Sequence, residues 1–238
     1  MCCASLPSRA APPEPGPAPP AASGALAVFD LDGTITRADT LAPYIFGYLW
    51  RAPWRLPRLL AVLPALARFG CDRDRGVLKG ALLHATLGGL PRARLAHWSE
   101  HFVAWLLRHG VYRQALQAIE AHRRRGDRLV LMSASTDLYV PQIGRALGFE
   151  DVICTRVRWR DDERLDGRLA SANCREMEKQ RQLMALIERL RPGTVYTYGN
   201  SGADLPHMQL ATEGILVNGS SRLRRGATPG LRHVRWRH

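Results

Sequence analysis

Val28-Phe29-Asp30-Leu31-Asp32-Gly33-Thr34 is the stretch from which the fold of this chain can be inferred. The apolar run Ala25–Phe29 predicts a buried strand that ends where Asp30 begins. Because side chains alternate along an extended backbone, Asp30 and Asp32 project to the same side, beyond the carboxyl end of the strand. The glycine and threonine that follow permit a turn and add a hydroxyl beside the two acids. Open α/β sheets bind their ligands at this edge, so the stretch predicts a site there.

The two carboxylates repel each other at this spacing. Their proximity destabilises the fold unless a cation lies between them or one of them keeps its proton. Turns with the pattern D-x-D-G are common in surface loops, but those loops rarely follow a fully apolar strand. The motif therefore favours a functional site over a surface turn.

Length, composition and charge limit the possible domain organisation and binding partners. The 238 residues, 46% of them hydrophobic, are enough for one large domain or for a core with a smaller insert. The net charge of +13 comes almost entirely from arginine, because Lys79 and Lys179 are the only lysines. Such a charge suits an anionic partner: a phosphorylated substrate, an anionic membrane or a nucleic acid. The arginines are scattered and no aromatic-basic motif accompanies them, so nucleic acid is not expected.

The termini and cysteines bear on the cellular location. Residues 1–24 are rich in proline and alanine and predict a disordered leader without the apolar run of a secretory signal. The five cysteines are scattered without paired spacing, which fits reduced thiols in the cytoplasm. We therefore expect a cytoplasmic protein, with peripheral contact at the inner face of the membrane left open.

A helical, strongly apolar region follows the acidic motif, and we expect residues 38–110 to form an insert. Tryptophan, tyrosine and arginine are interleaved with leucine there, especially between residues 44 and 67. Such helices pack on the core with their arginines outward, or they lie on a membrane interface, and the two alternatives are compatible.

From Val111 onward, short apolar strands alternate with amphipathic helices, which predicts a doubly wound parallel sheet of the α/β class. The core would comprise residues 25–37 and 111–238. Within it, Asp166-Gly167 predicts the turn of a hairpin, and residues 222–238 predict a surface strand and turn.

Three further polar positions come at or just beyond predicted strands or helix starts, at the edge where Asp30 and Asp32 are expected. Ser133 follows the apolar run 129–132, Lys179 lies near the start of a helix, and Asp204 closes the loop Gly199-Asn-Ser-Gly-Ala-Asp204. Each position has an ordinary structural explanation when considered alone. Together with the acidic pair, in this order, they form a specific set.

These four segments resemble the four signature motifs of the haloacid dehalogenase-like hydrolase superfamily, over residues 25–218. The helical insert, with Asn173–Lys179 and Tyr198–Pro206, is similar to subfamily IB, which contains phosphoserine phosphatase and the C-type phosphatidylglycerophosphatase. The resemblance implies a Rossmann-like core, an all-helical cap over residues 38–110 and an aspartyl-phosphate intermediate.

The resemblance also implies a role for each motif residue. Asp30 would attack phosphorus, and Asp32 would protonate the leaving group and then accept a proton from water. Thr34, Ser133, Ala134 and Lys179 would bind the phosphoryl group of the substrate. Mg²⁺ would be held by Asp30, Asp32 (through its backbone carbonyl), Asn200 and Asp204.

One position departs from the family pattern. The fourth motif commonly begins Gly-Asp, whereas this chain has Asn200, whose amide oxygen can bind Mg²⁺ but brings no charge. A lower affinity for the metal is expected.

The predicted function is Mg²⁺-dependent hydrolysis of a small or amphiphilic phosphate monoester, such as a phospholipid headgroup phosphate or a phosphoserine-like compound. The cap contains few acids that could bind a free amine, which favours the phospholipid headgroup phosphate over the phosphoserine-like compound. Two alternatives remain at this point: a non-catalytic, basic membrane-surface binding protein on the same scaffold, and a phosphotransferase.

Overall fold

The computed structural model describes residues 24–221, 223 and 230–237. Six strands form one sheet in the order β3-β2-β1-β6-β7-β8, and every neighbouring pair is parallel. The strands are β1 (Leu26–Asp30), β2 (Arg128–Thr136), β3 (Asp151–Thr155), β6 (Val195–Gly199), β7 (Glu213–Val217) and β8 (Leu231–Val234). The predicted α/β fold with a parallel sheet is confirmed. The predicted leader, apart from Gly24, lies outside the described residues.

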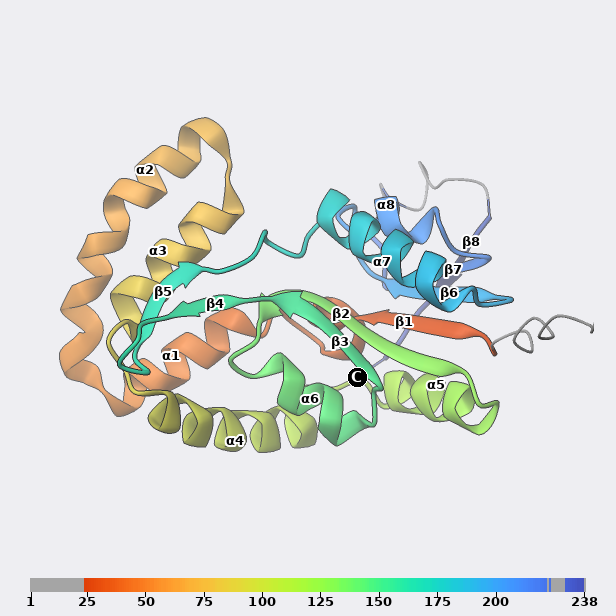
Figure 1. Ribbon diagram of the computed structural model, residues 1–238, viewed down its shortest axis with the longest axis horizontal. Coiled ribbons are helices and arrows are strands. Elements are labelled where there is room, and N and C mark those ends of the chain that lie inside the picture. Colours follow the sequence, from red (N-terminus) through yellow and green to blue (C-terminus); the bar gives the residue numbers. More distant parts are fainter. Residues whose placement is uncertain (1–23, 222, 224–229, 238) are drawn as a thin grey trace, which may run out of the picture.

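Helices cover both faces of the sheet (Figure 1). Below it in that view are α5 (Arg113–Arg124) and α6 (Val140–Leu147), and above it are α7 (Met177–Leu190) and the short α8 (Leu205–Met208). All five residues of β1 are buried, and their side chains alternate between the two faces. Ala27 and Phe29 pack in the cluster that includes α5 and α6, while Leu26 and Val28 pack against α7. The apolar character of the whole strand follows from this double burial.

Helices and one 3₁₀ helix occupy the chain between β1 and α5. They are α1 (Leu41–Arg51), the 3₁₀ helix η2 (Pro53–Val62), α2 (Leu63–Asp72), α3 (Arg75–Leu87) and α4 (Arg92–His109). The chain leaves and rejoins the core at one point, where Thr36 pairs with Val111. None of the described helices is long and apolar enough to cross a membrane.

Two of these helices, α1 and α4, belong to the same hydrophobic core as the sheet. The helices from α1 to α4 are called the helical layer below. Tyr44 of α1 packs on Tyr139, which precedes α6, with ring centroids 4.6 Å apart. The hydroxyl groups of Ser99, on α4, and Tyr44 are hydrogen-bonded to each other at 2.9 Å. Ser99 Oγ also donates to the Leu138 carbonyl at 2.7 Å. Residues of α1, α4, α5, α6 and β1 thus belong to one continuous cluster.

The predicted hairpin exists, but its turn is not at Asp166-Gly167. Strand β4 (Val157–Trp159) pairs antiparallel with β5 (Leu165–Leu169), and residues 160–164 make the turn. Gly167 lies inside β5 with φ +91°, where a Cβ atom would come within 2.3 Å of the Cα of His84 in α3. The glycine is therefore explained by the close approach of the strand to α3, and the sequence-based turn assignment was wrong for that reason.

Candidate active site

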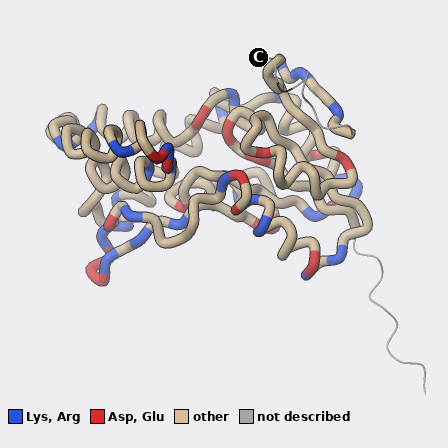
Figure 2. Tube along the Cα trace, turned by 90° about the horizontal axis from the view of Figure 1, so that it is seen from above, with Lys and Arg blue, Asp and Glu red and all other residues tan. Residues whose placement is uncertain are grey.

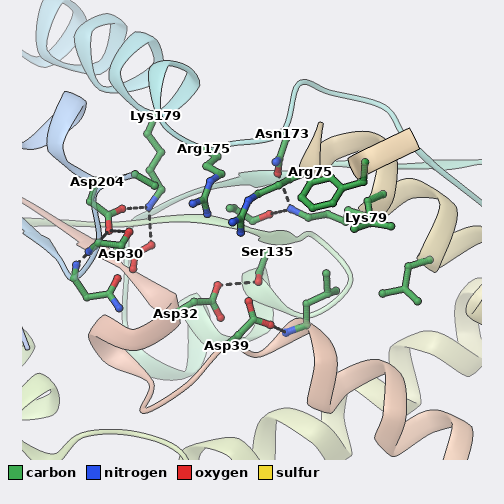
Figure 3. Close-up of a pocket in the computed structure, with 18 residues that line it drawn as sticks. Asp30, Asp32, Asp39, Arg75, Lys79, Ser135, Asn173, Arg175, Lys179 and Asp204 are labelled. Atoms are coloured by element: carbon green, nitrogen blue, oxygen red, sulfur yellow. Dashed lines mark hydrogen bonds and ion pairs between the residues drawn. The ribbon is translucent and has the colours of Figure 1, made fainter. Parts of the chain in front are cut away.

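A cavity of about 390 Å³ opens at the carboxyl end of β1, between the sheet and the helical layer (Figure 3). Asp30 is the last residue of β1 and is only 5% exposed. Asp32 also lines the cavity, and Gly33, with φ +80°, turns the backbone directly after it. The predicted convergence of polar residues at this edge is observed for Asp30, Asp32, Lys179, Asn200 and Asp204, which all line the cavity.

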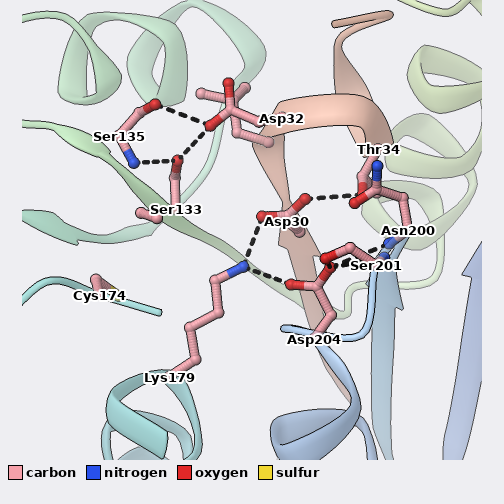
Figure 4. A network of polar contacts seen from close by, with 12 residues as sticks. Asp30, Asp32, Thr34, Ser133, Ser135, Cys174, Lys179, Asn200, Ser201 and Asp204 are labelled. Carbon is pink, nitrogen blue, oxygen red and sulfur yellow. Dashed lines mark hydrogen bonds and ion pairs between the residues drawn. The ribbon is translucent and has the colours of Figure 1, made fainter. Parts of the chain in front are cut away.

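Lys179 connects two carboxylates. Its Nζ donates to Asp30 Oδ1 at 2.6 Å and to Asp204 Oδ1 at 2.7 Å, and its side chain is only 3% exposed (Figure 4). The other oxygen of Asp30 accepts a hydrogen bond from Thr34 Oγ1 at 2.9 Å. The nucleophile candidate is therefore held at both oxygens, in a fixed orientation.

The charges of this cluster are strongly coupled. Burial and the charge of Asp204 raise the pKa of Asp30 to about 7, against the effect of Lys179. Burial acts in the same direction on Asp204, but Lys179, His207 and the hydrogen bonds from Lys179 and Ser201 together lower the pKa of Asp204 to about 2. Burial would lower the pKa of Lys179, yet the two carboxylates raise it above its ordinary value. One cation for two buried carboxylates leaves the cluster short of positive charge.

Asp32 lies in a different environment. Its Oδ1 accepts from the backbone N–H of Thr40 at 2.8 Å and from the Thr40 hydroxyl at 2.6 Å. Its Oδ2 accepts from Ser135 Oγ at 2.8 Å and Ser133 Oγ at 3.2 Å. Burial raises the pKa of Asp32 above its ordinary value, although the donors from Thr40 and Ser135 oppose the rise. Its hydrogen-bond donors are all uncharged.

The predicted phosphate-binding hydroxyls do not lie on the cavity wall. Thr34 and Ser133 are fully buried, and they support Asp30 and Asp32 respectively. Strand β2 continues to Thr136, so Ser133 lies inside the strand rather than beyond it. Ala134, which the sequence predicts to bind the phosphoryl group, lines the cavity together with Ser135.

The loop after β6 holds Asp204 firmly. Asp204 Oδ2 accepts hydrogen bonds from the N–H groups of Asn200 and Ser201, at 3.2 and 3.1 Å, and from Ser201 Oγ at 2.9 Å. The Asn200 amide packs directly on Gly33, where a Cβ atom would lie 2.0 Å from its nitrogen. The glycine of the first motif thus leaves room for the asparagine of the fourth.

The oxygen donors fit a hard divalent cation. Among the described residues, no three His, Cys, Asp or Glu side chains gather into a metal cluster. Asp30 and Asp204 supply two carboxylates, so further protein ligands would be neutral oxygens, such as the Asn200 amide. Mg²⁺ is commonly bound by one or two carboxylates together with water and substrate oxygens. A cation would also supply the positive charge that this carboxylate pair lacks.

Several cavity residues were not singled out from the sequence. Lys79 lies on α3, and its Nζ donates to the Ala134 carbonyl at 2.5 Å and to Asn173 Oδ1 at 2.6 Å. Burial lowers its pKa to about 8. The sequence offered one sign of its importance: Lys79 is one of only two lysines in a chain rich in arginine, and both lysines line the cavity. The others are Asp39, Arg75, Ser135, Asn173, Arg175 and Ser201.

The side of the cavity away from Asp30 is amphipathic. The guanidinium groups of Arg75 and Arg175 converge on it from α3 and from the segment before α7 (Figure 3). Apolar side chains complete the wall: Leu41, Phe69, Leu78 and Leu82. Asp39 also lines the cavity, and its Oδ1 accepts from the N–H of Leu41 at 2.9 Å.

Comparison with known proteins is consistent with this geometry. A model of the haloacid dehalogenase-like hydrolase family matches residues 27–209. Protein CicA of Caulobacter vibrioides is 34% identical over 195 residues, which cover 79% of this chain and 83% of that protein. A histidinol-phosphatase of Neisseria meningitidis is 24% identical over 214 residues, 85% of this chain and 94% of that protein.

Solved structures share the fold. A Bordetella pertussis protein of unknown function superposes with a TM-score of 0.75 at 24% identity, covering 89% of this chain and 98% of that one. Phosphoserine phosphatase in its apo form gives a TM-score of 0.60 at 16% identity, with coverage of 88% and 93%.

Proposed function

The chain belongs to the haloacid dehalogenase-like hydrolase family, and on that basis we propose that it is a Mg²⁺-dependent phosphatase that acts through an aspartyl-phosphate. The names of two similar proteins, a histidinol-phosphatase and a phosphoserine phosphatase, support the reaction class. The subfamily inferred from the sequence remains a prediction.

The observation that carries this proposal is the difference between the two motif carboxylates. Asp30 contacts the buried cation Lys179, whereas Asp32 has only neutral donors, and burial raises its pKa. Two carboxyl groups held in different environments suit a nucleophile and a general acid, respectively.

The proposed reaction has two displacements at phosphorus. In the first, an oxygen of Asp30 forms a bond to phosphorus while the ester P–O bond breaks, and Asp32 gives its proton to the departing alkoxide. In the second, water attacks the same phosphorus and the bond to Asp30 breaks, while Asp32 accepts a proton from the water. Thr34 keeps Asp30 oriented, and Lys179 neutralises charge on the phosphoryl oxygens.

Asp30, Asp204, the Asn200 amide and the Asp32 backbone carbonyl would hold Mg²⁺. When bound, the ion supplies positive charge that favours the ionised form of Asp30 and attracts the phosphoryl group. Thr34 and Ser133 contribute by positioning Asp30 and Asp32, because neither lines the cavity.

We also propose that residues 38–110 form the cap that selects the substrate. Arg75 and Arg175, with the apolar wall beside them, favour a phosphate ester that carries both a further anionic group and an apolar part. A phospholipid headgroup phosphate has this character, and a small phosphoserine-like ester has it in part. Peripheral contact with an anionic membrane is likewise a proposal.

The test is phosphate release from a panel of monoesters that differ in charge and chain length, with and without Mg²⁺. Wild type is compared with Asp30→Asn and with Asp161→Asn, whose exposed acid lies outside the cavity. We expect turnover to vanish only in Asp30→Asn. Equal turnover by all three proteins would exclude the covalent mechanism, and no hydrolysis by wild type on any ester would favour the binding protein.

An added alcohol tests the intermediate directly. If all substrates pass through one aspartyl-phosphate, the ratio of phosphorylated alcohol to free phosphate is the same for every leaving group. A ratio that changes with the leaving group would contradict a common intermediate. A ratio dominated by the phosphorylated alcohol would identify a phosphotransferase.

A further inference from the structure

Exposed apolar side chains concentrate on one part of the helical layer. Among the described residues, twelve large hydrophobic side chains are exposed, and seven of them lie between residues 46 and 66. Trp50 is 89% exposed and Trp54 is 71% exposed. The other five are Phe46, Leu56, Leu60, Leu63 and Leu66. Such a concentration exceeds the scatter of single apolar residues that is normal on a protein surface.

The helices that carry most of this surface are scarcely packed. Neither η2 nor α2 has a single buried residue, although leucine, valine, alanine, tryptophan and phenylalanine make up six of the ten residues of η2 and five of the ten residues of α2. Helix α2 lies at the outer edge of the described part of the molecule, beside α3 and η2 (Figure 1). An apolar helix is ordinarily stabilised by burying one face, and among the described residues nothing buries a face of η2 or α2.

The charge of the same segment is of one sign. Arg51, Arg55, Arg58 and Arg68 lie within residues 40–71, which contain no aspartate or glutamate. Asp72, the last residue of α2, accepts from Arg68 Nε at 2.9 Å. Figure 2 shows the basic positions, in blue, spread along the chain rather than gathered on one element. The guanidinium groups of Arg55 and Arg58 both donate to the backbone carbonyl of Gly88, after α3, at 3.2 and 3.5 Å. Arg51 stays exposed while it stacks on the Trp98 ring at 4.6 Å. Exposed apolar side chains, with four arginines against the single Asp72 in residues 40–72, complement an anionic surface with an apolar interior.

We propose that residues 46–69, the outer cap surface, bind the surface of an anionic lipid bilayer. Tryptophan, phenylalanine and leucine enter the interfacial region, and the exposed Arg51 and Arg58 contact lipid phosphates. Phe69, at the carboxyl-terminal end of α2, also lines the cavity. Binding through this surface therefore places one wall of the cavity near the bilayer. The inference concerns binding alone, and it holds whether or not the protein hydrolyses phosphate esters.

The test is co-sedimentation of the full chain with vesicles. One set contains phosphatidylcholine alone, and in the other about a third of the lipid is phosphatidylglycerol. We expect binding to the anionic set to be at least about tenfold tighter and to weaken as salt is added. Equal binding to both sets, or no binding to either, would overturn the proposal.

A matched pair of variants locates the binding surface. Trp50→Ala combined with Trp54→Ala is expected to weaken binding to anionic vesicles about tenfold or more. The control combines Leu116→Ala on α5 with Met184→Ala on α7, two exposed apolar residues outside the cap, and should bind like wild type. Because all four side chains are exposed, circular dichroism should show folded protein in each case. Unchanged binding by the tryptophan variant would refute the assignment.

The same variants decide between a bilayer and a second copy of the chain. Sedimentation velocity without lipid should give one species for wild type and the tryptophan variant. If wild type self-associates and the tryptophan variant does not, the outer cap surface is a protein interface and the proposal is wrong.

Discussion

Replacing Asp30 by asparagine should abolish activity and yet stabilise the metal-free protein at neutral pH. The carboxylate is buried, and it lies close to Asp204 with only Lys179 as a cationic partner. Burial and the charge of Asp204 raise the pKa of Asp30 from 3.8 to about 7. Asparagine has nearly the same shape as a protonated aspartate, so the variant removes the ionisation without opening a cavity.

The direction of the effect follows from proton linkage. Between pH 4 and 7 the folded state keeps the proton on Asp30, while the unfolded state releases it. The contribution of Asp30 to stability is therefore fully present below pH 4 and is lost as pH rises through 7. A rise of the pKa from 3.8 to about 7 corresponds to at most about 4 kcal/mol.

The assay is urea unfolding of wild type and Asp30→Asn between pH 4 and 8, with chelator present. The difference in unfolding free energy should be near zero at pH 4, should grow to at most about 4 kcal/mol in favour of the variant by pH 8, and should level off. Adding Mg²⁺ at pH 8 should stabilise wild type by about 3 kcal/mol at a hundred times its dissociation constant, and Asp30→Asn by much less. A difference that does not change with pH would refute the reasoning, as would a variant less stable than wild type at pH 8.

Three further substitutions test the surroundings of Asp30. Asn200→Asp adds a charged ligand and should lower the half-saturating Mg²⁺ concentration about tenfold; no change in an activity titration would show that this residue does not bind the metal. Gly33→Ala places a Cβ 2.0 Å from the Asn200 amide nitrogen at φ +80°, whereas Gly89→Ala has φ +79° and open space around it. The first variant should therefore lose about 1–3 kcal/mol more unfolding free energy than the second. Equal losses measured by calorimetry would exclude the collision. Lys79→Met breaks both hydrogen bonds from α3 to the core and should raise KM more than it lowers kcat; an unchanged KM would contradict a positioning role.

The architecture could be predicted because its signals are local. Apolar runs followed by polar residues mark the parallel strands, and double burial of β1 explains why Leu26 to Phe29 contain no polar residue. Asp166-Gly167 shows the limit of local signals. The same dipeptide that favours a turn is used inside β5, because α3, far away in the sequence, leaves no room for a side chain at position 167.

The cavity could be predicted only in part, for a similar reason. Asp30, Asp32, Lys179 and Asp204 each follow a recognisable motif, whereas Arg75 and Arg175 come from helix-rich segments that bring them together only in three dimensions. Ser133 resembled a phosphate ligand in the sequence. In the structure β2 continues four residues beyond the apolar run, to Thr136, and the Ser133 hydroxyl donates to Asp32. The end of a strand is uncertain by one or two residues in any assignment, and sequence patterns fix it less closely still.

The continuous hydrophobic cluster that joins α1 and α4 to the sheet has a consequence for how the protein can evolve. Those two helices should unfold together with β1 and exchange their amide hydrogens slowly, whereas η2 and α2 contribute no buried residue to that cooperative unit. Substitutions in η2 and α2 therefore carry little risk of unfolding the sheet. Natural variation can accumulate there and alter what the outer helices contact, while the carboxylates at the end of β1 stay in register.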